Sequence, residues 1–162
     1  MLDRFQYFQE GTCIVHHLFG GDVCSIVREA YGDAYITAHF EVPGEMFRLA
    51  MEAKKRGMGV VGSTSNILSF IASTVKDQIA NRTTDRLQFI LGTESGMITS
   101  IVNTVKSVLK GTSSLSDLEV EIVFPVSSRA ITTEHQSTDR RVTLPGVSPV
   151  VVKRLPVLRG AL

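Results

Sequence analysis

Residues 59–66 read Gly-Val-Val-Gly-Ser-Thr-Ser-Asn, and this stretch decides the fold because two sequence patterns meet in it. A short apolar run ends at Gly62, three hydroxyl residues follow, and a helical spacing of apolar residues begins at once. This order is typical of a buried strand that leads into a helix whose first turn has free N–H groups. Ser63, Thr64 or Ser65 can cap that helix, and the stretch alone favours such a cap over a binding site for an anion.

The same succession of strand and helix occurs on both sides of this stretch. Apolar runs at 12–15, 34–38, 59–62 and 87–91 each precede a segment with helical spacing, and an alternating run follows at 118–124. The pattern predicts an α/β fold in which repeated strand–helix units form open parallel sheets within α/β/α layers. The alternation at 118–124 predicts a strand that is half exposed or lies at an edge of the sheet.

The character of the sequence changes after residue 127. Residues 128–162 contain many hydroxyl and charged residues, three prolines and no helical period. Proline is excluded from inner strands because it cannot donate to the ladder. We therefore expect two regions, an α/β region over residues 1–127 and a poorly ordered region over residues 128–162.

The overall composition describes an ordinary globular protein and argues against several classes of function. Hydrophobic residues make up 43% and charged residues 20% of the 162 residues. A formal net charge of +1 gives no electrostatic case for binding nucleic acid or a membrane surface. The first residues carry no secretory or transit pattern, so the chain as written is expected in the cytosol. Its two cysteines, Cys13 and Cys24, lack zinc-type spacing and indicate a reducing compartment.

Polar side chains with reactive groups follow the same end of four predicted strands. The carboxyl ends of parallel strands share one rim of a sheet, where ligands of open α/β sheets bind, so we expect a site at this rim. The residues are Cys13, His16 and His17, then His39 and Glu41, then Ser63 and Thr64, and finally Thr93 and Glu94.

Each of these residues also has a plainer explanation when it is taken alone. A histidine can be satisfied in the core, a carboxylate can favour a helix N-terminus, and a cysteine can be a small core residue. Together, imidazoles, carboxylates, a thiol and hydroxyls suit general acid–base chemistry on a substrate rich in carboxylate or phosphate. The sequence contains no Gly-x-Ser-x-Gly elbow, no Walker loop and no dinucleotide fingerprint.

Four motifs, in this order, resemble the quinolinate synthase family in its plant plastid form. They are GTCIVH at 11–16, HFEVP at 39–43, GSTS at 62–65 and GTESG at 92–96, and the resemblance covers about residues 5–127. It implies a transferase that condenses iminoaspartate with dihydroxyacetone phosphate to quinolinate in the de novo biosynthesis of NAD. It also implies a [4Fe–4S] cluster whose open iron acts as a Lewis acid, and a location in the chloroplast.

The resemblance assigns roles to particular residues of this sequence. Glu41 and a histidine would take acid–base steps, and Ser63 with Thr64 would hold a carboxylate or phosphate. Cys24 falls inside a predicted helix and matches no family ligand, so we expect a core residue there. The implied set is His16, His39 and Glu41 as catalytic residues, Ser63, Thr64, Thr93 and Glu94 as substrate-binding residues, and Cys13 as a metal ligand.

The sequence also departs from the family, and we expect residues 128–162 to be a tail that does not belong to it. The family has three similar α/β layers and three cluster cysteines, whereas this sequence lacks the first layer and the C-terminal cysteine-rich segment. One thiolate cannot hold a cubane cluster unaided, so we expect this chain alone to be inactive. The alternative is a catalytically inactive fragment of the same fold that binds an anion or a partner. The sequence does not decide whether the chain forms a homodimer.

Overall fold

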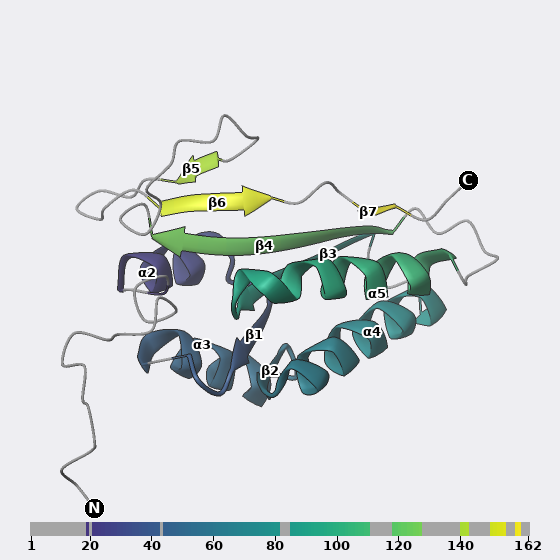
Figure 1. The fold of residues 1–162 in the computed structure, drawn as a ribbon, viewed down its shortest axis with the longest axis horizontal. Helices are drawn as coiled ribbons and strands as arrows, with labels where there is room; N and C mark the ends of the chain where they lie inside the picture. The colour runs from purple at the N-terminus through teal and green to yellow at the C-terminus, as the bar shows by residue number, and fades with distance from the viewer. Residues whose placement is uncertain are drawn as a thin grey trace, which may run out of the picture.

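The computed structural model describes residue 19 and residues 21–42, 44–81, 85–110, 118–127, 140–142, 150–154 and 158–159. In chain order the elements are α2 (Gly21–Ala30), β1 (Tyr35–His39), α3 (Gly44–Lys55), β2 (Gly59–Gly62), α4 (Thr64–Asn81), β3 (Arg86–Gly92), the 3₁₀ turn η2 (Ser95–Met97), α5 (Ile98–Lys110), β4 (Glu119–Ser127), β5 (Arg140–Val142), β6 (Val150–Arg154) and β7 (Leu158–Arg159) (Figure 1). The predicted strand at 12–15 lies outside the described residues.

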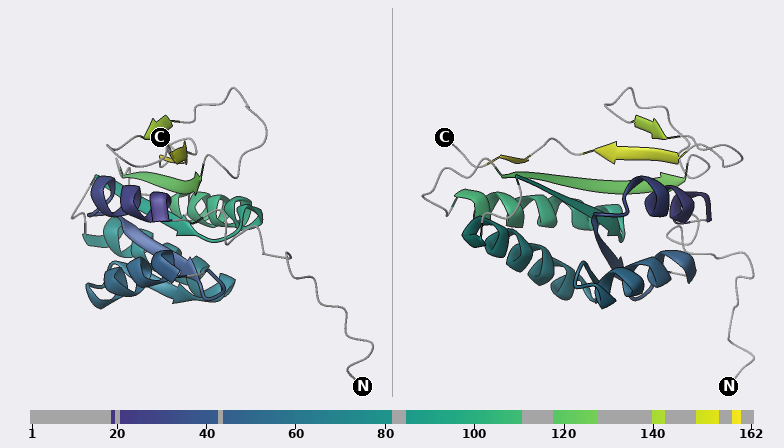
Figure 2. Two further views of the ribbon diagram at one scale, coloured as in Figure 1. Left: turned by 90° about the vertical axis from the view of Figure 1, so that its left-hand side faces the viewer. Right: turned by 180° about the vertical axis from the view of Figure 1, so that it is seen from behind.

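The strands form one sheet in the order β2-β1-β3-β4-β6-β5, and β7 pairs with the beginning of β4. Strands β2, β1, β3 and β4 are parallel to one another, whereas β6 is antiparallel to both β4 and β5. Helices α4 and α5 cover one face of the parallel part, and α2 and α3 cover the other (Figures 1 and 2). The predicted α/β fold with a parallel sheet is therefore confirmed.

The helix boundaries follow from local chemistry that the sequence carries. Helix α3 ends in a Schellman motif, in which Met58 N–H donates to Ala53 O at 2.9 Å and Gly57 N–H donates to Lys54 O at 3.0 Å. Gly57 adopts a φ of 76°, a left-handed conformation that glycine reaches without steric cost. In the described part of the chain, no helix is long and apolar enough to cross a membrane.

The core lies between the sheet and its helices, and α3 packs especially close to the strands. A Cβ atom on Gly59 would come within 2.8 Å of the Ala53 Cβ, and one on Gly92 within 2.8 Å of Thr37 O. These two glycines therefore allow close packing at both of their strands. The helical spacing of apolar residues predicted after Gly62 is seen in α4, where Ile67, Ile71 and Val75 are fully buried and Ile79 is half-buried.

Strand β4 corrects the sequence-based expectation for residues 118–124. The strand lies inside the sheet between β3 and β6, and Glu121 is buried along with its apolar neighbours. The sequence at 118–124 suggested an exposed face because Glu121 is charged, and charged residues usually face solvent. It is instead paired in register with Gln88 of β3, whose Nε2 donates to Glu121 Oε2 at 2.7 Å, and Arg86 also forms an ion pair with its carboxylate. The prediction of a half-exposed or edge strand was wrong.

Beyond residue 127 the structure describes strands β5, β6 and β7 alone. Residues Val123–Ser127 of β4 pair with Arg154–Val150 of β6, which extends the sheet past its parallel part. Most other residues of this region lie outside the described ones. The expectation that residues 128–162 are poorly ordered therefore stays a prediction.

Candidate functional site

A crevice opens where the strand order reverses between β1 and β3. The chain leaves β1 toward β2 on one side of the sheet order and leaves β3 toward β4 on the other. Loops that diverge in this way leave a gap at the carboxyl ends of the two strands, which is where ligands of open α/β sheets bind. A cavity of about 70 Å³ lies there, lined by His39, Glu41, Val42, Thr93, Glu94 and Met97.

The turn after β1 holds the backbone that carries the imidazole of His39. Phe40 N–H donates to Gly62 O at 3.2 Å, and Val42 N–H donates to His39 O at 3.0 Å, so the backbone is held to β2 and to itself. Glu41 N–H donates to His39 Nδ1 at 3.4 Å. A ring nitrogen that accepts a hydrogen bond carries no proton, so this contact corresponds to a neutral imidazole with its proton on Nε2.

The carboxylate of Glu41 lies beside the same ring. Its Oε2 is 3.8 Å from His39 Nδ1, and the side chains of His39 and Glu41 are 20% and 76% exposed. If the imidazole takes up a second proton, Nδ1–H can turn from the backbone contact to this carboxylate. The pair can therefore hold a proton near the cavity or release one from Nε2.

The turn after β3 forms the opposite wall of the cavity. The buried hydroxyl of Thr93 donates to Met97 Sδ at 2.9 Å, and Met97 N–H donates to Glu94 O at 3.2 Å. A thioether is a weak acceptor, so a ligand oxygen could replace it as the partner of the Thr93 hydroxyl. Glu94 is exposed at the rim.

Ser63 and Thr64 lie at the same rim but do not line this cavity. They follow β2, which flanks β1 on the side away from β3. Ser63 Oγ donates to Asn66 Oδ1 at 2.7 Å and accepts from Asn66 N–H at 3.4 Å, while Ser63 N–H donates to Asn66 Oδ1 at 2.9 Å. These reciprocal contacts are those of a helix N-cap, so the plainer explanation is confirmed for Ser63.

The charge of the cavity differs from the one expected for a carboxylate-rich or phosphate-rich substrate. Among the described residues that line it, two are carboxylates, one is an imidazole and none is a lysine or arginine. Carboxylates accept hydrogen bonds and repel anions. The described walls therefore suit groups of a ligand that donate hydrogen bonds or lose protons, rather than its charged oxygens.

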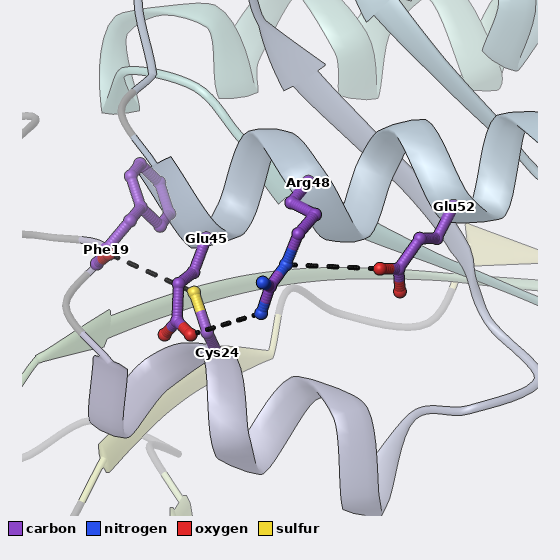
Figure 3. A network of polar contacts seen from close by, with 5 residues as sticks. All are labelled: Phe19, Cys24, Glu45, Arg48 and Glu52. Carbon is purple, nitrogen blue, oxygen red and sulfur yellow. Dashed lines mark hydrogen bonds and ion pairs between the residues drawn. The ribbon is translucent and has the colours of Figure 1, made fainter.

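Of the two cysteines, Cys24 lies within the described residues and Cys13 does not. Cys13 and His16, which the sequence suggested as a metal ligand and a catalytic residue, lie outside the described residues. Cys24 is buried between α2 and α3 in the network of Figure 3, with its Sγ 4.0 Å from Phe19 O. Burial, and next the carboxylate of Glu45, raise the pKa of its thiol to about 11. The prediction that Cys24 is a core residue is confirmed.

The described residues do not fit an iron–sulfur cluster by themselves. Within the described ranges, no group of three or more His, Cys, Asp or Glu side chains could hold a metal ion. A cluster needs thiolates, and a thiol with a raised pKa in an apolar site does not supply one at neutral pH.

A second, larger hollow lies at the opposite end of the sheet. It measures about 470 Å³ and is lined by residues from the C-terminal ends of α2 and α3 and from β1, with Arg28, Lys55 and Arg56 among them. Cations at helix C-termini complement the helix dipole, which explains these three side chains without a ligand.

Sequence reasoning missed several features of the site. Val42 and Met97 line the cavity, but an apolar residue beside a polar motif gives no sequence signal for that role. Phe40 is the exposed large apolar side chain of the described residues, and it stacks on His39. Its position inside the HFEVP motif was the one available signal.

Comparison with known proteins finds similar plant sequences. A chloroplastic quinolinate synthase from Nicotiana tabacum is 62% identical over 135 residues, which is 82% of this chain and 19% of that protein. One from Arabidopsis thaliana is 55% identical over 160 residues, which is 99% of this chain and 21% of that protein. One from Oryza sativa subsp. japonica is 56% identical over 134 residues, 81% of this chain and 19% of that protein.

The chain spans about a fifth of the length of these curated relatives. The Arabidopsis match also includes most of the region after residue 127. No family model matches the chain. No solved structure matches it either.

Proposed function

Along its matched residues the chain belongs to the quinolinate synthase family, and on that premise we propose that it supplies part of that enzyme's active site. The proposed reaction is the condensation of iminoaspartate with dihydroxyacetone phosphate to quinolinate, with release of phosphate and water, in NAD biosynthesis. The relatives are named as chloroplastic, and we propose the same location for this chain.

The observation that supports this proposal best is the convergence of four polar residues at the crevice between β1 and β3. His39 and Glu41 come from one wall, and Thr93 and Glu94 come from the other. Forming a ring from these two substrates requires C–H protons to be removed and hydroxyl groups to leave as water. Such steps need groups that accept and donate protons within hydrogen-bond reach of the substrate.

The roles of His39 and Glu41 follow from their contacts. With Nδ1 accepting the Glu41 N–H, the imidazole presents a donor at Nε2, which suits a leaving hydroxyl or a carbonyl oxygen. The carboxylate of Glu41 is solvent-exposed and acceptor-only, which suits removal of a proton. Once His39 is protonated, the carboxylate at 3.8 Å from Nδ1 would stabilise the imidazolium.

The carboxylates and the phosphate of the substrates would need binding partners outside this cavity. Ser63 is committed to its cap, but the first-turn N–H groups of α4 remain a favourable position for an anion, and Thr64 is exposed there. We propose that a carboxylate or phosphate binds at this N-terminus, one strand away from the acid–base pair. The roles of Thr93 and Glu94 in substrate binding are proposed without a specific assignment.

The family's [4Fe–4S] cluster would supply a Lewis-acidic iron, and Cys13 would be one of its ligands. The described residues do not fit a cluster by themselves. The contribution proposed here rests on His39, Glu41 and their neighbours alone.

A second candidate function is a module of the same fold that binds ligand or partner without turnover. The small volume of the cavity, about 70 Å³, argues against turnover by the described walls alone, because sites for small organic ligands usually measure roughly 300 Å³ or more. In the enzyme, further walls would enlarge the site. In the second candidate, the described walls would act without them.

The test is to place this sequence in the Arabidopsis relative, in exchange for the segment that it matches, and to measure quinolinate formation. We expect activity, and we expect His39→Ala and Glu41→Gln each to lower kcat by about 100-fold or more. The control is Glu29→Gln, which changes an exposed carboxylate on α2. Full activity in both site variants would contradict the proposal. An inactive chimera that still binds substrate would favour the second candidate.

A further inference from the structure

Phe40 has an unusual position for a large apolar side chain. It is 57% exposed, and it lies on the turn that carries His39 and Glu41 into the cavity. Single exposed apolar residues are common and need no explanation by themselves. This one makes a specific contact, because its ring stacks on the imidazole of His39 with centroids 4.3 Å apart and an angle of 30° between the planes.

The backbone holds Phe40 in place for that contact. Its N–H donates to Gly62 O at the end of β2, so the residue is tied to the neighbouring strand and not to a free loop. With 57% of its surface exposed, Phe40 buries too little apolar area to be a core residue. Its ring lies against the ring of His39.

The polar contacts of the imidazole are weak. The Glu41 N–H contact with Nδ1 measures 3.4 Å, which is long for a hydrogen bond and therefore weak. The Glu41 carboxylate is 3.8 Å from Nδ1 and pairs strongly only with a protonated ring. Contacts of this strength leave the ring free to turn unless its face is also held. Aromatic faces that stack supply such a restraint.

We propose that Phe40 is a positioning residue for His39. Its ring fixes the plane of the imidazole, so that Nδ1 stays on the Glu41 N–H and the proton stays on Nε2, where it is available to a ligand. The catalytic consequence of this inference rests on the proposed function. The orientation itself is a property of this chain and can be measured without turnover.

The test is the nitrogen NMR spectrum of the histidine rings in the full chain, which distinguishes a proton on Nε2 from one on Nδ1. His39→Gln identifies the signals of His39 among those of the four histidines. We expect the Nε2–H form to dominate in the unaltered chain. In Phe40→Ala, the ratio of the Nε2–H to the Nδ1–H form should fall by roughly two- to tenfold, the factor that a stacked aromatic pair is worth.

Two further variants separate positioning from simple loss of packing. Phe40→Tyr keeps a flat ring and should restore the ratio, whereas Phe40→Leu keeps bulk without a face and should not. Phe70→Ala removes a ring that packs on Tyr35 at the other end of β1 and serves as the matched control. It should lower the melting temperature and leave the His39 ratio unchanged. If Phe40→Ala does not fold, the comparison of Phe40→Leu with Phe40→Tyr decides the question.

An unchanged ratio in folded Phe40→Ala, or an equal fall in Phe70→Ala, would overturn the inference. In the active chimera, Phe40→Ala should lower kcat by roughly two- to tenfold at an unchanged KM, and Phe40→Tyr should recover it. If the chimera has no activity, the proposed function fails. The ratio measured in the chain still decides whether Phe40 positions His39.

Discussion

Glutamate side chains differ in burial and in pairing between the two ends of the sheet. Near the amino ends of β3 and β4, Glu121 is 3% exposed and is held by the guanidinium of Arg86 and the amide of Gln88. At the carboxyl ends of β1 and β3, Glu41 and Glu94 are exposed, and no lysine or arginine lies with them among the described residues that line the cavity.

The difference indicates how the chain divides its charges between stability and function. A buried carboxylate must be paired and hydrogen-bonded, because otherwise its desolvation would destabilise the fold. An exposed carboxylate without a cationic partner contributes little to stability and remains able to accept a hydrogen bond or a proton from a ligand. Removing a carboxylate at the amino end should therefore lower the stability of the fold, whereas removing one at the carboxyl end should leave the stability nearly unchanged.

The largest expected effect is on stability at the amino end. Glu121→Ala should lower the free energy of unfolding by about 2–3 kcal/mol, because it leaves the Gln88 amide and the Arg86 guanidinium without their carboxylate. The loss stays below that of a fully buried pair, since Arg86 is 55% exposed and can return to water. Urea denaturation followed by circular dichroism measures it.

Glu41→Ala is the matched control at the carboxyl end and should change the free energy of unfolding by less than about 0.5 kcal/mol. Equal losses in Glu121→Ala and Glu41→Ala would break the comparison, because the two ends would then be equally structural.

Cys24 is a second buried group whose ionisation should affect the stability of the fold. Burial raises its thiol pKa from an ordinary value of 9.0 to about 11, so the unfolded chain loses this proton at lower pH than the folded chain does. The stability linked to Cys24 is therefore complete below about pH 9 and is lost as the pH rises toward about 11. Urea denaturation at pH 8 and pH 10.5 should show a steeper fall for the unaltered chain than for Cys24→Ala. Parallel falls would show that this thiol is not buried as described.

Ser63 is expected to have a smaller, purely structural effect at the carboxyl end. Ser63→Ala removes the hydroxyl that caps α4 and should lower the free energy of unfolding by about 1 kcal/mol. Thr64→Ala, one residue later, changes an exposed side chain and should cost less than about 0.5 kcal/mol. Thermal unfolding of the two variants side by side measures the difference. A larger loss in Thr64→Ala would contradict the assignment of Ser63 as the cap.

A small effect on stability is also expected for Phe40. Since the side chain is 57% exposed, Phe40→Ala should lower the melting temperature by only about 1–3 °C. A larger shift would mean that Phe40 supports the fold as well as the imidazole of His39.

Much of the architecture could be predicted because the helices and strands depend on local sequence patterns. The apolar runs and helical spacings predicted the elements from α2 to α5. The grouping of His39 with Glu94 at one rim followed from the rule that parallel strands end together. These features depend on residues close in the sequence or on a general property of parallel sheets.

The remaining features depend on strand order and register, which local patterns do not contain. Ser63 is separated from the cavity because β2 lies on the far side of β1 from β3. Glu121 is buried because the register places it opposite Gln88. The absence of lysine and arginine from the described cavity walls likewise required the two walls to be identified first.

The most direct test of this account is a titration of the nitrogen-15-labelled chain with oxaloacetate, the stable keto counterpart of iminoaspartate, followed by amide chemical shifts. We predict that the largest changes fall on residues 39–42 and 93–97, where the keto group would lie at the carboxyl ends of β1 and β3, and on residues 63–66, where a carboxylate would bind at the N-terminus of α4. Changes centred on Arg28, Lys55 and Arg56, in the hollow at the opposite end of the sheet, would contradict the claim that the crevice between β1 and β3 is the ligand site.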